Sequence, residues 1–128
     1  MMQKVKREHR LLIHTGTHGD EYEVIELVKN YLEKNRGRLP SFVFVPEVSP
    51  SAVKNKTRRN NLGHDLNREF FTDSTDPEVQ TNIEVIKNKK FDLFVSFHED
   101  PLETSYYIYD VGTGREENKY VLKHNQEL

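Results

Sequence analysis

The sequence predicts an α/β fold, a mostly parallel or mixed sheet with helices on both faces. Two observations lead to this class. Continuous apolar runs of strand length alternate along the chain with segments whose apolar residues recur at helical spacing. Two of these runs also end in polar segments that contain a histidine, and the carboxyl ends of parallel strands are where ligands gather in such sheets.

The first half of the chain gives a strand, a helix and a second strand. The apolar run 11–14 is a buried strand that stops at a glycine-bounded loop containing His18. Apolar residues recur at helical spacing over 20–35, and Gly37 follows as a stop signal, which predicts a helix. The continuous apolar run 41–45 closes at a proline, and its length favours a strand.

The second half is predicted to begin with a long loop. Residues 47–73 have no sustained period and are rich in Asn, Arg, Pro and Ser, with room for one helical turn; loops this long are usually functional or disordered. A helix over 76–90 opens with an N-cap aspartate followed by proline. The run 91–97 is a buried strand that delivers His98 at its carboxyl end, and 106–109 predicts one further strand.

Composition limits the classes of protein that the chain can be. A length of 128 residues with 34% hydrophobic content suits one domain over 1–128. A net charge of -2 with 31% charged residues favours neither a nucleic-acid nor a membrane partner. The apolar stretch 11–13 is too brief for a signal-peptide core or a membrane span, so a cytoplasmic protein is the expectation.

Three residues form a candidate metal site. The chain has no cysteine, so a transition metal would be held by His, Asp or Glu. His18 and Glu21 are spaced to turn toward one point, and His98 arrives from a separate strand end. Two histidines and a carboxylate leave a tetrahedral zinc ion one open position, which is the catalytic arrangement. The alternatives are a solvated helix start, a histidine that caps a strand, and His14 as a weaker rival ligand.

A further motif lies in the long loop, and with it the chain resembles a known family. Three segments carry the resemblance: His18-Gly19-Asp20-Glu21, Arg58 through Arg68, and His98-Glu99-Asp100. In order and spacing they resemble the zinc carboxypeptidase superfamily, including its succinylglutamate desuccinylase and aspartoacylase branch. The similarity runs from about Leu11 to about Tyr109. The motif Asp65-Leu66-Asn67-Arg68 is its most specific part.

The resemblance implies a set of ligands and a carboxylate clamp. It implies that His18, Glu21 and His98 hold one zinc ion. It also implies that Asn67 and Arg68 bind the carboxylate of the substrate. The physics agrees, because a guanidinium meets a carboxylate with two parallel charge-assisted hydrogen bonds and an amide adds a neutral donor.

Two more roles follow from the resemblance. Arg58 matches the arginine that polarises the scissile carbonyl and stabilises its oxyanion, and Arg59 is the runner-up. Asp65 matches an acid that accepts the ring N–H of His18 and so fixes its orientation. Without the resemblance, these arginines would be interpreted as solvated loop charges.

The activity implied is zinc-dependent hydrolysis of an amide bond next to a carboxylate. The substrate would be a small anionic molecule or a peptide C-terminus, and carboxypeptidase and N-acyl amino acid deacylase stay open as alternatives. A non-catalytic module that binds zinc and a carboxylate is a second hypothesis. A plain α/β domain with accidental histidines is a third.

The general base is the part that the sequence does not supply. In the family it is a glutamate on a later strand, and no position here matches it. Glu99 follows a proposed ligand, but adjacent strand residues point to opposite faces. Glu116, Glu117 and Glu127 lie in a polar segment without a strand pattern. We therefore expect the N-terminal part of a longer domain, with a sheet edge that allows oligomerisation.

Overall fold

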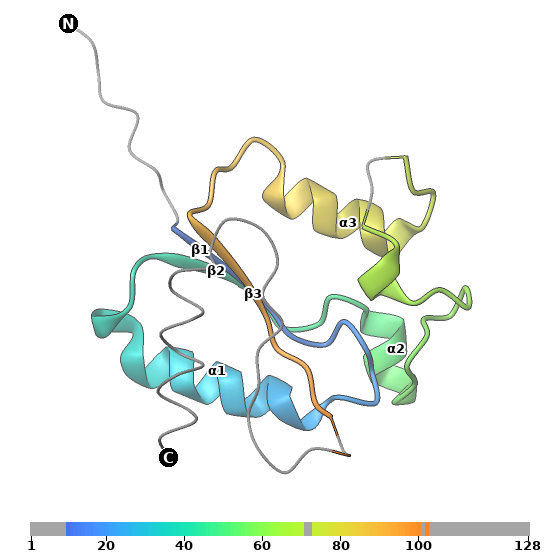
Figure 1. The fold of residues 1–128 in the computed structure, drawn as a ribbon, viewed down its shortest axis with the longest axis horizontal. Helices are drawn as coiled ribbons and strands as arrows, with labels where there is room; N and C mark the ends of the chain where they lie inside the picture. The colour runs from blue at the N-terminus through green and yellow to red at the C-terminus, as the bar shows by residue number, and fades with distance from the viewer. Residues whose placement is uncertain (1–9, 71–72, 101, 103–128) are drawn as a thin grey trace, which may run out of the picture.

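The computed structural model describes residues 10–70, 73–100 and 102, and a parallel sheet forms its centre (Figure 1). The sheet has three strands in the order β2-β1-β3. Their bounds are Leu11–His14 for β1, Phe42–Val45 for β2 and Leu93–Ser96 for β3. In the parallel register, His14 lies opposite Val45 on one side and Ser96 on the other. All three strands therefore end at one edge of the sheet.

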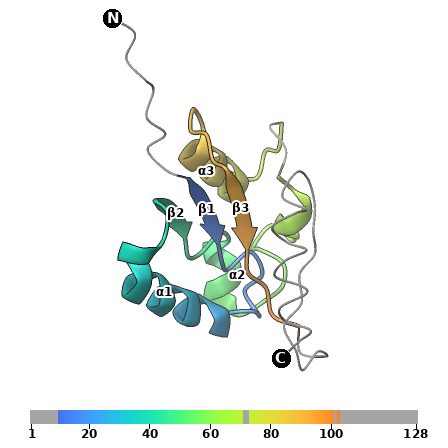
Figure 2. The same cartoon turned by 60° about the vertical axis from the view of Figure 1, so that its left-hand side comes forward.

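Helices lie on both faces of this sheet. Helix α1 (Glu23–Asn35) runs along one face and α3 (Pro77–Ile86) along the other, while α2 (Pro50–Asn55) lies beyond the carboxyl ends of the strands (Figures 1 and 2). Two 3-10 turns, η1 (Arg36–Arg38) and η2 (Leu66–Arg68), complete the elements. The predicted α/β class with a parallel sheet is confirmed. None of the described helices is long and apolar enough to cross a membrane.

Each face of the sheet has its own apolar core. Ile13 of β1 packs with Val28 and Leu32 of α1, which recur at helical spacing on one side of that helix. On the other face, a second cluster joins Val48, Leu66 and Val79, with Val45 and Ile83 packed against it. Because Leu66 belongs to η2, the second core anchors the loop that carries the Asp-Leu-Asn-Arg motif.

The segment predicted as a long loop contains more helix than expected. Helix α2 begins at the N-cap Ser49, whose side chain accepts from the Ala52 amide, and Pro50 occupies the first turn. It ends at Asn55, and the C-cap residue Lys56 adopts a left-handed conformation with φ 54. The 3-10 turn η2 follows further along.

Two predicted helix bounds differ from the structure, and one predicted strand lies outside the described residues. Helix α1 starts at Glu23 rather than at residue 20, because the Glu21 amide donates to the His18 carbonyl in a turn before the helix. Helix α3 ends at Ile86 instead of residue 90, and Asn88 follows with a positive φ of 63. The strand expected at 106–109 lies outside the described residues, as do Glu116, Glu117 and Glu127.

Candidate metal centre

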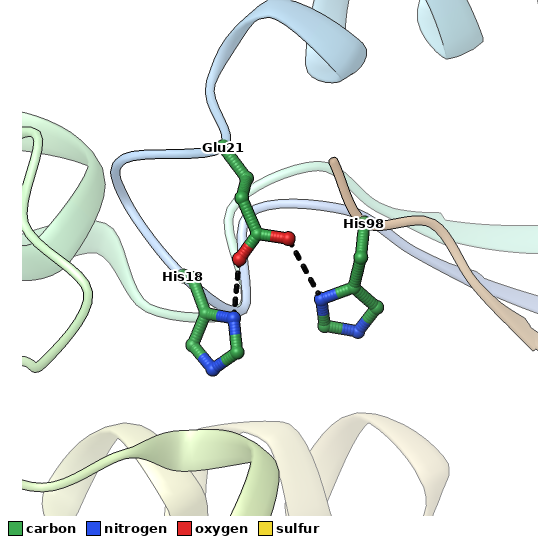
Figure 3. A group of neighbouring side chains, drawn as sticks. All are labelled: His18, Glu21 and His98. Carbon is green, nitrogen blue, oxygen red and sulfur yellow. Dashed lines mark hydrogen bonds and ion pairs between the residues drawn. The ribbon is translucent and has the colours of Figure 1, made fainter. Parts of the chain in front are cut away.

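The three predicted ligands meet at the carboxyl edge of the sheet. His18 and Glu21 come from the connection between β1 and α1, and His98 lies two residues beyond the end of β3. Figure 3 shows the carboxylate of Glu21 between the two imidazole rings. Strand pairing between β1 and β3 therefore brings together residues that are 77 positions apart in the chain.

The ligand atoms of this group face one another. Nδ1 of His18 contacts one carboxylate oxygen of Glu21, and Nδ1 of His98 lies 3.1 Å from the other. One ligand atom from each of the three residues lies within 4.8 Å of the others. Among the residues that the structure describes, no other group of histidines and acids gathers in this way.

The chemistry of these donors fits a zinc ion. Nε2 of His18 lies 2.7 Å from Oδ1 of Asp65, and since a carboxylate only accepts, this nitrogen is the donor. Nδ1, which faces Glu21, is therefore the nitrogen that can lose its proton and offer a lone pair to a cation. Nδ1 of His98 also faces Glu21, so two imidazole nitrogens and a carboxylate converge, a set that zinc accepts.

Burial and hydrogen bonding set the charge of the group. Burial alone would raise the pKa of Glu21, but hydrogen bonds from His18, His98 and the Glu99 amide lower it to about 2. The hydrogen bond with Glu21 is the largest effect on His18 and raises the pKa of that imidazole. Glu21 is thus held ionised between the two imidazoles, and its carboxylate can attract a cation.

A glycine lets the loop that carries His18 pack directly on α2. The Gly19 amide donates to the Thr57 carbonyl at 2.7 Å. A Cβ atom at Gly19 would lie 1.8 Å from the carbonyl oxygen of Ala52, so a side chain cannot fit without displacing backbone. The residue between His18 and Asp20 is therefore glycine for a packing reason that the sequence pattern did not reveal.

Asp65 connects the proposed ligands to the predicted clamp. Besides His18, its Oδ1 accepts from the Asn67 amide at 3.0 Å and so caps η2. Its Oδ2 lies 3.3 Å from Nη2 of Arg58 and 3.9 Å from Nε of Arg68. Burial alone would raise the pKa of the Asp65 carboxyl group, but hydrogen bonds from His18 and the Asn67 amide, with the charges of His18 and Arg58, together lower it. One buried carboxylate thus holds an imidazole and two guanidinium groups.

The guanidinium groups beside Asp65 reach solvent. The side chain of Arg58 is 55% exposed and that of Arg68 is 77% exposed, and Asn67 is exposed as well. Arg59, the runner-up, instead donates to the Gly63 carbonyl at 3.0 Å within its own loop. This geometry favours Arg58 over Arg59 as the arginine next to the ligands.

Two residues behave differently from the three ligands. His14, the rival ligand, is buried against the rings of Phe70 and Phe94, and burial lowers its pKa to about 4. It takes no part in the group. Glu99 donates its amide to Oε1 of Glu21 at 2.8 Å, although its side chain was expected to face away. No sequence signal indicated this backbone contact.

A second polar cluster holds the loop from behind. We call Asn60, His64, Asp76 and Glu78 the loop network. Oδ2 of Asp76 accepts from Nδ2 of Asn60 and Nδ1 of His64, both at 2.7 Å, and Oδ1 accepts from the Glu78 amide at 2.8 Å. The Glu78 carboxylate in turn accepts from Ser49, Ser51 and Asn60. This cluster ties the arginine-bearing loop to α2 and α3.

The fold and the site together define a class. The carboxyl edge of this parallel sheet carries two histidines, an ionised glutamate and nearby guanidinium groups. These residue types, at this place in an α/β fold, are typical of the active sites of hydrolytic enzymes. The chain belongs to the family of the succinylglutamate desuccinylase/aspartoacylase catalytic domain, whose model matches residues 7–124. The predicted family is thereby confirmed, and it is a family of amide hydrolases. Comparisons with curated proteins and with solved structures find no match.

Proposed function

We propose that this protein is a zinc-dependent hydrolase that cleaves an amide bond next to a carboxylate. The observation that carries the proposal is the convergence of His18, Glu21 and His98 at the sheet edge, with Asp65 joining His18 to two exposed arginines. Family membership supports amide hydrolysis as the reaction type. Zinc dependence and a carboxylate in the substrate are the parts of the proposal that go beyond family membership.

Each residue of the site has a distinct role in this proposal. A bound zinc ion would supply an activated water and polarise the scissile carbonyl. Arg68 and Asn67 bind the substrate carboxylate and fix the register of attack. Arg58 donates to the oxygen on which negative charge develops. Asp65 keeps Nδ1 of His18 directed toward the ion. The substrate class is a small anionic N-acyl amino acid or a peptide C-terminus.

A second function is favoured by the carboxylates around the group. A general base needs a carboxylate that can reach the attacking water. Glu21 faces both imidazoles, Asp65 accepts from His18, and the Glu99 carboxylate accepts from backbone amides in α1. Each of these carboxylates already interacts with a partner through at least one oxygen, which favours a non-catalytic module that binds zinc and a carboxylate as the alternative.

Metal analysis tests the shared part of both functions. Protein purified without chelators is expected to contain about one zinc per chain by elemental analysis. His18→Ala and His98→Ala each remove one of three ligands and should lower zinc affinity at least about a hundredfold. His64→Ala is the matched control and should keep the zinc. Wild-type protein without zinc would contradict the proposal.

Hydrolysis assays separate the enzyme from the module. N-acyl amino acids and C-terminal peptides are the substrates, and Arg68→Ala is expected to abolish turnover while the zinc content stays unchanged. Arg38→Ala, which removes an exposed arginine from η1, is the control. Zinc binding without turnover, combined with carboxylate binding that Arg68→Ala removes, would establish the module.

A further inference from the structure

Glu99 contacts Glu21, one of the three proposed zinc ligands, through its backbone amide. Its amide donates to Oε1 of Glu21 at 2.8 Å, and the same oxygen lies 3.1 Å from Nδ1 of His98. Two consecutive residues after β3 therefore hold one carboxylate oxygen of Glu21. Any shift of this backbone would move both contacts together.

The side chain of Glu99 fastens this backbone to α1. Its carboxylate accepts hydrogen bonds from the amides of Glu23 and Val24, in the first turn of the helix. The first amides of a helix have no partner within it, and Tyr22 at the N-cap supplies no side-chain hydrogen bond. A residue 76 positions after Glu23 (99 − 23) thus takes over the capping of α1.

The charges around Glu99 oppose this placement in the absence of a cation. Its Oε2 is buried without a hydrogen-bond partner in the described part of the chain. Burial is the main effect that raises the pKa of this carboxyl group, and repulsion from Glu23 and Glu21 adds to it. A cation bound beside Glu21 would offset this repulsion, since opposite charges at short range attract strongly where water is partly excluded.

We infer that Glu99 is a positioning residue for the metal ion: it pins the end of β3 to the start of α1, so that Glu21 and His98 reach the ion together. This inference rests on the proposed zinc site and adds a residue to it. Removal of the side chain would free the backbone that donates to Glu21. Groups that orient metal ligands typically contribute about tenfold to a hundredfold in metal affinity.

Zinc affinity, measured by competition with a chromophoric chelator on the full chain, tests the inference. Glu99→Ala should weaken zinc binding about tenfold to a hundredfold. Glu99→Gln, whose amide oxygen can still accept from α1, should fall between the wild type and Glu99→Ala. Glu26→Ala removes another acid from the first turn of α1, at an exposed position, and should change affinity by no more than about twofold.

Two further measurements exclude a merely structural role. The visible absorption of the Co²⁺-substituted protein reports ligand geometry, and it should change in Glu99→Ala and largely recover in Glu99→Gln. Urea unfolding of the metal-free protein reports the capping alone. Lower stability with unchanged zinc affinity and an unchanged Co²⁺ spectrum would overturn the inference. Wild-type protein that binds no zinc would instead overturn the proposed function.

Discussion

Asp65 and Asp76 each accept a hydrogen bond from a histidine at 2.7 Å, yet their surroundings differ. In the loop network, Asp76 also receives the Asn60 side chain and a backbone amide, so its oxygens are matched by donors. At the sheet edge, the histidine held by Asp65 turns its other nitrogen toward Glu21, which also faces His98. The oxygens of Asp76 are matched by donors, whereas at the sheet edge two imidazoles and a carboxylate turn their ligand atoms toward one another.

The comparison indicates which features separate a candidate metal site from a structural polar cluster. A histidine paired with an aspartate is common to both, so that pair is not informative by itself. The direction of the potential ligand atoms is informative, because a cation needs several of them aimed at one point. Only the group at the sheet edge has this convergence among the described residues.

The largest expected effect is on stability, in the loop network. Asp76→Ala removes the N-cap of α3 and the acceptor for two side chains, and Asp76 is 1% exposed. Loss of one partner in a buried hydrogen-bonded network should lower the free energy of unfolding by about 3 kcal/mol. Urea unfolding of the metal-free protein measures this. If Asp76→Ala removed zinc without destabilising the fold, the distinction between the two clusters would be wrong.

The next effect is on zinc affinity, at the matched aspartate. Asp65→Asn keeps the shape of the side chain but weakens the acceptor that orients His18, so zinc should bind about tenfold to a hundredfold more weakly. Chelator competition gives the affinity. His64→Gln alters the corresponding pair in the loop network and should leave zinc affinity within about twofold. Equal losses in both variants would remove the basis of the comparison.

The smallest expected effect concerns His14, a histidine without a carboxylate partner. Burial lowers its pKa from 6.5 to about 4, and its Nε2 has no partner among the described residues. Between these two values the unfolded chain binds the extra proton and the folded chain does not, so stability falls as pH falls. From pH 7 to pH 5 the loss attributable to His14 should be about 2 kcal/mol.

His14→Phe isolates this contribution, since phenylalanine suits a position between two aromatic rings and does not titrate. Urea unfolding of metal-free wild type and variant at several pH values gives the difference in stability, in which the contributions of other groups cancel. The variant should gain relative to the wild type as the pH falls. A constant difference between pH 7 and pH 5 would show that His14 is not held neutral.

Sequence periodicity predicted the elements that bury a continuous face. The sequence predicted the strands at 11–14 and 41–45 and the helix centred on Val28, because the apolar residues of these elements pack in the core of the sheet. Helix α2 was assigned to the loop because six residues are too few to show a helical period. Its Ser49-Pro50 start was the readable signal.

In the candidate site, too, the features set by neighbouring residues could be predicted from the sequence, and those set by distant residues could not. The spacing of His18 and Glu21 and the strand before His98 can be read from the sequence, because neighbouring positions determine them. The reason for Gly19 and the contact of Glu99 with α1 depend on residues far away in the chain. Such contacts are set by tertiary packing, so no local pattern records them. The roles of these residues stay predictions until they are measured.

The separation of the proposed ligands also has a kinetic consequence. Glu21 and His98 are 77 residues apart, so they meet only after β3 has paired with β1. Closing so long a segment costs chain entropy before any contact stabilises it, which makes this pairing a late step in folding. We expect zinc uptake during refolding to lag behind helix formation and to report the completed sheet. The ion would then stabilise a sheet that has already formed and would not initiate folding.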